Sequence, residues 1–319
     1  MLYNIIFSLN IVLPLVILAA LGYIAKRMGL LTDTFLAGGN KVIFHMAIPA
    51  TLFNSLYSAD LSEVFDLGFI AFIAIWTIAS FTIIWILTHL ALRKRHPGVT
   101  SAYVNGAHRG NLAMLGLPLL FTILGDGSEG AKVALAAAII IPLYNIQTIV
   151  MLTLHSSIQK KVSIKGLLLS IIKNPPIIGI AFGLAAAFAG ITLPVIAGHT
   201  ISSLASLTVP LALICLGGAM TFKGFDAKFS LAISASLVKV VILPIITIAL
   251  AWLLGFRGND LTILMILHGV PTAVGSYVMI VEFGGDAYVA GTNVMMTTIL
   301  SAFTLSILIF AFRTAGIIL

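Results

Sequence analysis

One arginine in the middle of an apolar segment has the most telling chemistry in the chain. Arg109 is followed by Gly110 and Asn111 and lies far from either end of the apolar run Val99–Leu124. An arginine at the centre of a membrane helix costs about 2.5–3.5 kcal/mol on insertion scales, so it normally faces protein or water and marks a pathway. Its planar guanidinium suits a carboxylate or a phosphate. The sequence therefore predicts a site for an anion. The structural alternative is a buried ion pair, for which Glu282 is a distant candidate.

Two apolar segments contain residues that interrupt a helix, with polar residues inside each interruption. Proline has no N–H and pushes the residue before it out of the helical region. In hydrocarbon such breaks persist only where they line a cavity or are buried in protein. We expect both breaks to border a substrate cavity, although glycine and proline also simply kink membrane helices. The residues concerned are Gly110, Asn111, Gly116 and Pro118 in Val99–Leu124, and Pro271, Thr272 and Gly275 in Leu261–Phe283.

Other polar side chains within apolar segments are candidates for the same site. Among the amides we favour Asn145 for the cavity, and Tyr277 is a candidate for its wall. His108 and His268 flank the two breaks, where they could relay protons or simply hydrogen-bond a neighbouring helix. Lys239 could face the interior or extend its stem to the membrane interface. The secondary candidates are therefore Lys239, His108, His268 and Asn54.

The composition indicates which elements must position these residues. Of the 319 residues, 60% are hydrophobic and only 8% are charged, with a mean hydropathy of +1.17. Soluble domains contain about 25% charged residues, so a soluble enzyme is excluded. Transmembrane β-barrels alternate apolar and polar residues, whereas this chain has unbroken apolar runs of helix length. We predict an all-α polytopic membrane protein.

Apolar runs separated by charges and turn residues predict ten membrane helices. Each crossing needs about 20 predominantly apolar residues, and the chain has room for ten such runs. The predicted spans are Leu2–Ala25, Phe35–Tyr57, Phe65–Leu92, Val99–Leu124, Gly130–His155, Pro175–Ile191, Ser202–Phe222, Phe229–Gly255, Leu261–Phe283 and Ala287–Phe312.

The ten spans divide into two halves of five, residues 1–158 and 175–319, joined by the short basic loop 159–174. Because five is odd, the second half has the opposite topology to the first. Most of the 17 lysines and arginines fall on the side of this loop, and most acidic residues fall on the other. The positive-inside rule then makes the loop cytoplasmic and both termini extracytoplasmic, in the cell membrane. The net charge of +7 reflects this topology, and no nucleic-acid partner is predicted.

A weak internal repeat supports the inversion. Pro14 and Pro175 are 161 residues apart, and so are Pro49 and Pro210. The same offset brings the two helix breaks into matching positions. Inverted repeats of broken helices are how many secondary transporters are built, with the substrate near the midplane at the repeat interface.

Several other chemistries are absent from the sequence. There is no Walker A motif for ATP hydrolysis, and no cofactor or metal site is predicted. Ser276 has no identifiable base, so catalysis is not expected. Neither break contains a carboxylate, which argues against a cation/proton antiporter with paired aspartates. The predicted partners are a small organic anion, the lipid bilayer and, in a homodimer, a second copy of the chain.

Four segments carry a family pattern. Residues 109–119 fit N-x-x-x-x-G-x-P-L, and residues 271–277 look like its counterpart in the second half. Residues 39–49 combine Asn-Lys with a later Ile-Pro, and Lys239 is followed by Pro244. In these segments the chain resembles the auxin efflux carrier family, which includes plant PIN carriers and bacterial malonate and malate permeases.

The resemblance implies ten helices in two inverted repeats, with broken crossover helices 4 and 9 and an elevator mechanism. Helices 1, 2, 6 and 7 would form a scaffold, and helices 3–5 and 8–10 would form the transport part. Gly110 stands where the plant carriers have proline, and Thr272 stands where they have glutamine. The long hydrophilic loop of many plant members is also missing. A bacterial-type organic-anion carrier therefore fits better than an auxin carrier.

The sequence thus predicts a secondary transporter that moves a small organic anion, a carboxylate, by alternating access. Arg109 would hold the anionic group, and Asn111 and Thr272 would supply side-chain hydrogen bonds. One alternative is a sodium-coupled symporter of the bile-acid type, which has a similar crossover but uses acidic and amide ion ligands. Another is a non-transporting membrane sensor with the same fold, which would bind its ligand without flux.

Overall fold

The computed structural model describes the helical body of the chain. Outside it lie the side chains of Val278 and Glu282, most of the first predicted span and most of the basic loop, so those predictions fall outside the described residues. Within the described parts the backbone forms helices and one isolated β-bridge, with no strand. The described residues are 17–57, 65–93, 95–125, 127–155, 172–219 and 228–317, together with Pro14 and Leu169.

In the described part of the chain, five helical stretches are long and apolar enough to cross a membrane, and shorter apolar helices accompany them. The predicted all-α membrane fold is confirmed at this level. The long stretches are α5 (Leu67–Leu92), α8 (Ser128–Leu154), α11 (Val195–Ser206) with α12 (Thr208–Gly218), α13 (Phe229–Leu237) through α14 (Leu243–Leu253), and α17 (Ala287–Thr314). The others are α2 (Asp33–Val42), α3 (Ile48–Tyr57), α6 (Pro97–His108), α7 (Leu117–Leu124), α10 (Pro175–Phe188), α15 (Asn259–Gly269) and α16 (Val274–Glu282).

Among the described residues, three short π-helical segments lie within or between these helices, and each begins six residues before a proline. In a π turn a carbonyl accepts from the N–H five residues further on, as the carbonyl of Ile43 does from Ile48. The helix can therefore continue past a proline, which offers no N–H. The segments are η1 (Ile43–Ala47) before Pro49, η2 (Leu112–Gly116) before Pro118 and η3 (Val238–Ile242) before Pro244.

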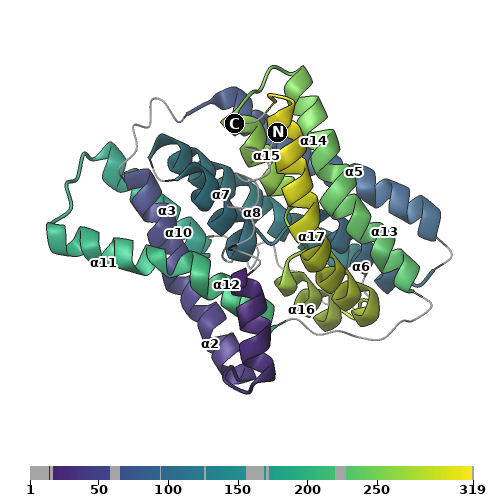
Figure 1. Cartoon of the computed structure of the whole chain (residues 1–319). Helices are drawn as coiled ribbons and strands as arrows, with labels where there is room; N and C mark the ends of the chain where they lie inside the picture. Colours follow the sequence, from purple (N-terminus) through teal and green to yellow (C-terminus); the bar gives the residue numbers. More distant parts are fainter. Residues whose placement is uncertain are drawn as a thin grey trace.

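The helices pack in two groups that meet along one boundary (Figure 1). In the first group α3 packs against α10 and α11, and α12 packs against α2. In the second, α5 packs against α6 and α8, α13 against α6 and α17, and α14 against α15. Small residues let α3 and α10 approach closely, because a Cβ on Gly179 would lie 2.5 Å from the carbonyl oxygen of Pro49.

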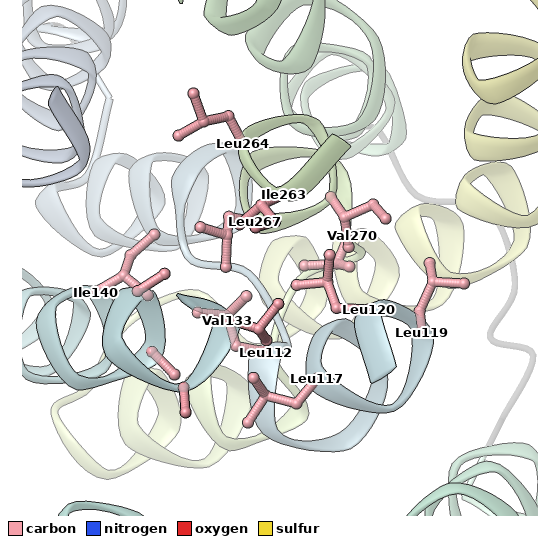
Figure 2. Close-up of a cluster of buried hydrophobic side chains, with 14 of the residues drawn as sticks. Leu112, Leu117, Leu119, Leu120, Val133, Ile140, Ile263, Leu264, Leu267 and Val270 are labelled. Carbon is pink, nitrogen blue, oxygen red and sulfur yellow. The ribbon is translucent and has the colours of Figure 1, made fainter. Parts of the chain in front are cut away.

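A buried apolar cluster holds the centre of the molecule together (Figure 2). Leu112, Leu117 and Leu120 come from η2 and α7, and each is at most 3% exposed. They face Ile263 and Leu267 of α15, which are fully buried. This cluster fixes the position at which the ends of the shorter helices meet.

Large apolar side chains are exposed along α5. Leu67, Ile75 and Leu87 are each more than half exposed, although α5 is one of the most hydrophobic helices. A soluble protein rarely exposes a contiguous apolar face of this kind. Such a face suits contact with lipid tails.

Candidate functional site

The helices α6 and α15 both stop in the interior of the molecule. After α6, Arg109 adopts an extended backbone with φ −72° and ψ 111°. After α15, Val270 is also extended, with φ −63° and ψ 151°, as expected for a residue that precedes a proline. The chain then resumes helical structure in η2 and in α16.

The two interruptions cross and hydrogen-bond to one another. The N–H of Asn111 donates to the carbonyl of Pro271 at 2.7 Å, and the N–H of Ala273 donates to the carbonyl of Arg109 at 3.2 Å. These bonds form an antiparallel bridge between Gly110 and Thr272. Four backbone groups of the two breaks are therefore paired, which removes the cost of leaving these four unsatisfied in hydrocarbon.

A cavity of about 360 Å³ lies beside this crossing. Arg109, Gly110, Asn111, Ala273 and Gly275 line it from the crossing itself. Further lining residues come from both helix groups and include Asn40, Phe44, Tyr144, Asn145, Asn174, Cys215 and Leu216. The cavity is thus bounded by both broken helices and by helices that are distant in sequence.

The guanidinium of Arg109 is anchored by neutral groups. One terminal nitrogen donates to Asn145 Oδ1 at 2.9 Å, and the other donates to Thr148 Oγ1 at 3.2 Å and contacts Met279 Sδ at 3.3 Å. None of the three ion pairs among the described residues includes Arg109, and the side chain of its predicted partner Glu282 lies outside them. A guanidinium has five N–H donors, so it retains capacity for a ligand in the cavity.

Three cavity amides carry buried atoms without a partner. Asn111 is only 6% exposed. Its side-chain nitrogen Nδ2 makes no hydrogen bond within the described part of the chain. The same holds for Oδ1 of Asn40 and Oδ1 of Asn174. An unsatisfied buried polar group costs about 1–3 kcal/mol. An acceptor oxygen of a ligand would satisfy Nδ2 of Asn111, whereas the Oδ1 atoms of Asn40 and Asn174 would need a hydrogen-bond donor.

The sequence comparisons agree with a membrane carrier. Residues 7–309 match the family described as "Membrane transport protein". The chain belongs to this family. Its resemblance to the auxin efflux carrier family, predicted from the breaks, is therefore confirmed. The family and the relatives are transporters and not enzymes.

Relatives match almost the full length of this transporter. An "Uncharacterized transporter" of Methanothermobacter thermautotrophicus is 30% identical over 93% of this chain and 96% of its own. A second "Uncharacterized transporter", from Methanocaldococcus jannaschii, is 24% identical over 94% and 97% of the two chains. A Rhizobium meliloti protein described as a "Putative malonate transporter" is 25% identical over 97% of each chain.

Several predicted site residues of the transporter lie outside the cavity lining. Thr272 is 2% exposed, and its hydroxyl donates to the carbonyl of Gly106 at 2.6 Å. Tyr277 packs against a small cluster around Val99 and Ile280. The structure thus brings Arg109, Asn111 and Asn145 together at the cavity, whereas Thr272 and Tyr277 do not line it. Three of the predicted crossover residues, Gly116, Pro118 and Pro271, are also buried and do not line the cavity.

The predicted secondary residues also have other surroundings. His108 Nε2 pairs with Ser80 Oγ at 3.0 Å, and His268 Nδ1 pairs with the carbonyl of Leu264 at 3.0 Å. Neither ring lines the cavity. The bond of His108 joins α6 to α5, as expected for a histidine that bonds a neighbouring helix, whereas Leu264 lies on the same helix as His268, so that bond stays within α15. The proton relay stays a prediction. Asn54 lines a second, smaller cavity of about 230 Å³ between α3, α7, α11 and α12.

Sequence reasoning missed Asn40 and Asn174 in the cavity lining, and also Thr148, which accepts a hydrogen bond from Arg109 but does not line the cavity. Thr148 lies three residues after Asn145 on α8, so helical spacing places both on one face and could have revealed it. Asn40 belongs to a segment quoted for the family resemblance, but its side chain was not assigned to the site. Asn174 precedes α10, and no feature of the sequence indicates that it reaches the cavity.

We expect Gly110→Ala to destabilise the crossing. A Cβ at this position would lie 2.9 Å from Val270 Cγ2 and 3.3 Å from the carbonyl oxygen of Leu267, both within a packed core. Overpacking of this kind typically costs about 1–3 kcal/mol. Thermal unfolding in detergent should show a lower Tm for Gly110→Ala. The control is Gly275→Ala, where nothing lies within 4 Å of the added Cβ. Equal Tm values for the two variants would contradict the tight crossing.

Proposed function

We propose that this protein is an elevator-type secondary transporter that carries a small organic anion, a carboxylate, across the cell membrane. The observation that carries the proposal is the guanidinium of Arg109 at the wall of a cavity, bonded only to neutral groups among the described residues. An anionic substrate would supply the missing negative charge. A carboxylate matches the planar donor fork of arginine.

The ends of the broken helices add to this preference for anions. Asn111 and Leu112 begin the helical segment η2 and α7, and Ala273 and Val274 begin α16; all four line the cavity. The N-terminal end of a helix carries partial positive charge and free N–H groups. A substrate bound here would therefore meet Arg109 and two helix N-termini together.

The cavity amides supply directional hydrogen bonds for the same substrate. In this proposal the unpartnered Nδ2 of Asn111 donates to a carboxylate oxygen, and Asn145 holds the Arg109 fork in place. Thr272 has a positioning role, because its hydroxyl ties the second break to the carbonyl of Gly106 on α6. The substrate named for the Rhizobium meliloti relative, malonate, supports a carboxylate.

We further propose ten membrane helices in two inverted repeats. The helix group that contains α2, α3, α10, α11 and α12 would be the scaffold, and the other group would be the moving transport part. The cavity supports this division, because Phe44 and Leu216 line it from the first group and Asn111 from the second. A sliding boundary between them would carry the site across the membrane.

The proposed orientation places both termini outside and the loop 159–174 in the cytoplasm. A cysteine introduced into this loop should react with a membrane-impermeant thiol reagent only after the cells are permeabilised. The background is Cys215→Ala, because Cys215 is the one native cysteine. Labelling of intact cells to the same extent would reverse the orientation.

Purified protein in liposomes tests the proposed function. We expect uptake of a radiolabelled small carboxylate, stimulated by the same carboxylate on the opposite side, and a rise in Tm when that carboxylate binds. Binding without flux would instead support the membrane sensor. A full panel of mono- and dicarboxylates that neither binds nor crosses would refute the proposal.

A further inference from the structure

Lys239 is a completely buried cation that the substrate cavity does not use. Its exposed fraction is 0%, and it is absent from the cavity lining. A lysine inside a membrane is costly and is normally paired. The three ion pairs in the described part of the chain involve other lysines, namely Lys26, Lys132 and Lys228. The ammonium instead donates to the carbonyl of His268 at 2.6 Å.

This carbonyl lacks a helical donor because of the break. In a continuous helix the carbonyl of His268 would accept from the N–H of Thr272, but that N–H donates to Thr297 Oγ1 at 3.0 Å. The preceding carbonyl, of Leu267, loses its donor because Pro271 has no N–H, and the hydroxyl of Tyr144 bonds it at 3.3 Å. The C-terminal end of α15 therefore presents carbonyl oxygens with partial negative charge.

The ammonium also lies against the crossing itself. A Cβ on Gly110 would be 3.3 Å from Lys239 Nζ. In carriers built from broken helices, unwound carbonyls and half-helix C-termini are the groups that coordinate a coupling sodium ion. At this crossing one such carbonyl, that of His268, accepts a hydrogen bond from the lysine nitrogen instead. A sodium ion at the same carbonyl would lie close to the ammonium, which contacts it at 2.6 Å, and the two positive charges would repel each other.

We propose that Lys239 is a fixed cation that replaces a coupling sodium ion at the crossing. It satisfies the helix-end carbonyl and supplies positive charge close to the substrate site. The transporter consequently binds no sodium here, and its flux is the same in sodium, potassium and choline media. The statement about flux rests on the proposed function, whereas the statement about sodium binding does not.

The test compares two substitutions that differ in the space they leave. Lys239→Ala removes the ammonium and opens room beside the carbonyl, whereas Lys239→Met removes the charge and fills the space. We expect both variants to lose carboxylate flux in choline medium. Only the alanine variant should recover part of its flux, and gain in Tm, when sodium replaces choline. Lys41→Met, which alters an exposed lysine, is the matched control and should behave as wild type.

Saturable binding of radioactive sodium to the wild-type protein, or flux that requires sodium, would overturn the proposal. So would normal flux of Lys239→Ala in choline medium, or a loss that sodium does not relieve, because the lysine would then be a structural donor only. If the alanine variant does not fold, two measurements on the wild-type protein still test the proposal: its sodium binding, and its flux in sodium, potassium and choline media. Absence of any carboxylate flux in the wild type would refute the proposed function and leave the sodium-binding result readable.

Discussion

Arg109→Gln is expected to abolish carboxylate binding and flux, and Arg109→Lys is expected to restore only a small part of them. Removing one member of a buried, hydrogen-bonded charge pair costs about 2–5 kcal/mol, which is roughly thirtyfold to several thousandfold in affinity. Lysine keeps the charge but is a compact point charge that cannot reproduce the planar fork. It would also lose the two-sided anchoring by Asn145 and Thr148. Isothermal calorimetry and flux in liposomes measure both effects.

The double variant Arg109→Gln with Glu282→Gln separates a substrate role from a structural one. If Arg109 served only as a partner of Glu282, removing both charges would be much milder than stranding one of them. We expect no rescue, because the guanidinium is already held by neutral groups in the described structure. Recovery of binding in a well-folded double variant would contradict the substrate role. The Tm of each variant confirms that the comparison is made between folded proteins.

The sequence predicted where the helices break because the cause of a break is local. Pro271 removes an N–H and constrains Val270, and these effects require no knowledge of the rest of the fold. The extended backbone of Val270 confirms this part of the reasoning. The pairing of Gly110 with Thr272 involves residues far apart in the chain. The matching positions of the two breaks made such a meeting plausible, but no local rule gives its hydrogen bonds.

Side-chain directions inside the breaks could not be obtained from the sequence. Helical spacing assigns residues to a face, but it fails where the backbone leaves the helix. Thr272 was therefore assigned to the substrate, whereas its hydroxyl lies against Gly106. On the intact helix α8, by contrast, Asn145 was predicted in the cavity and lines it. The direction of the Lys239 side chain could not be predicted either. A lysine in an apolar segment has the same sequence neighbours whether its side chain is buried in the protein, as it is here, or extends to the membrane interface.

Asn111 and Thr272 should therefore respond to substitution in different ways. Asn111→Ala removes an amide whose Nδ2 has no partner among the described residues, so the folded protein loses little. If that amide donates to a carboxylate, its removal weakens binding by about 1.5–3 kcal/mol, or roughly ten- to a hundredfold. We expect the Tm of the substrate-free protein to be unchanged and the substrate affinity to fall.

Thr272→Val is expected to act on stability first. Valine has nearly the shape of threonine but lacks the hydroxyl that donates to the carbonyl of Gly106 at 2.6 Å. Leaving that buried carbonyl without this donor costs about 1–3 kcal/mol, and the lost bond also ties the second break to α6. Thermal unfolding without substrate should give a lower Tm for Thr272→Val than for Asn111→Ala, and calorimetry with a carboxylate should give the opposite order of affinity loss. If Thr272→Val weakened binding as much as Asn111→Ala while keeping the wild-type Tm, the hydroxyl would be a direct substrate ligand, reached only when the crossing rearranges during transport.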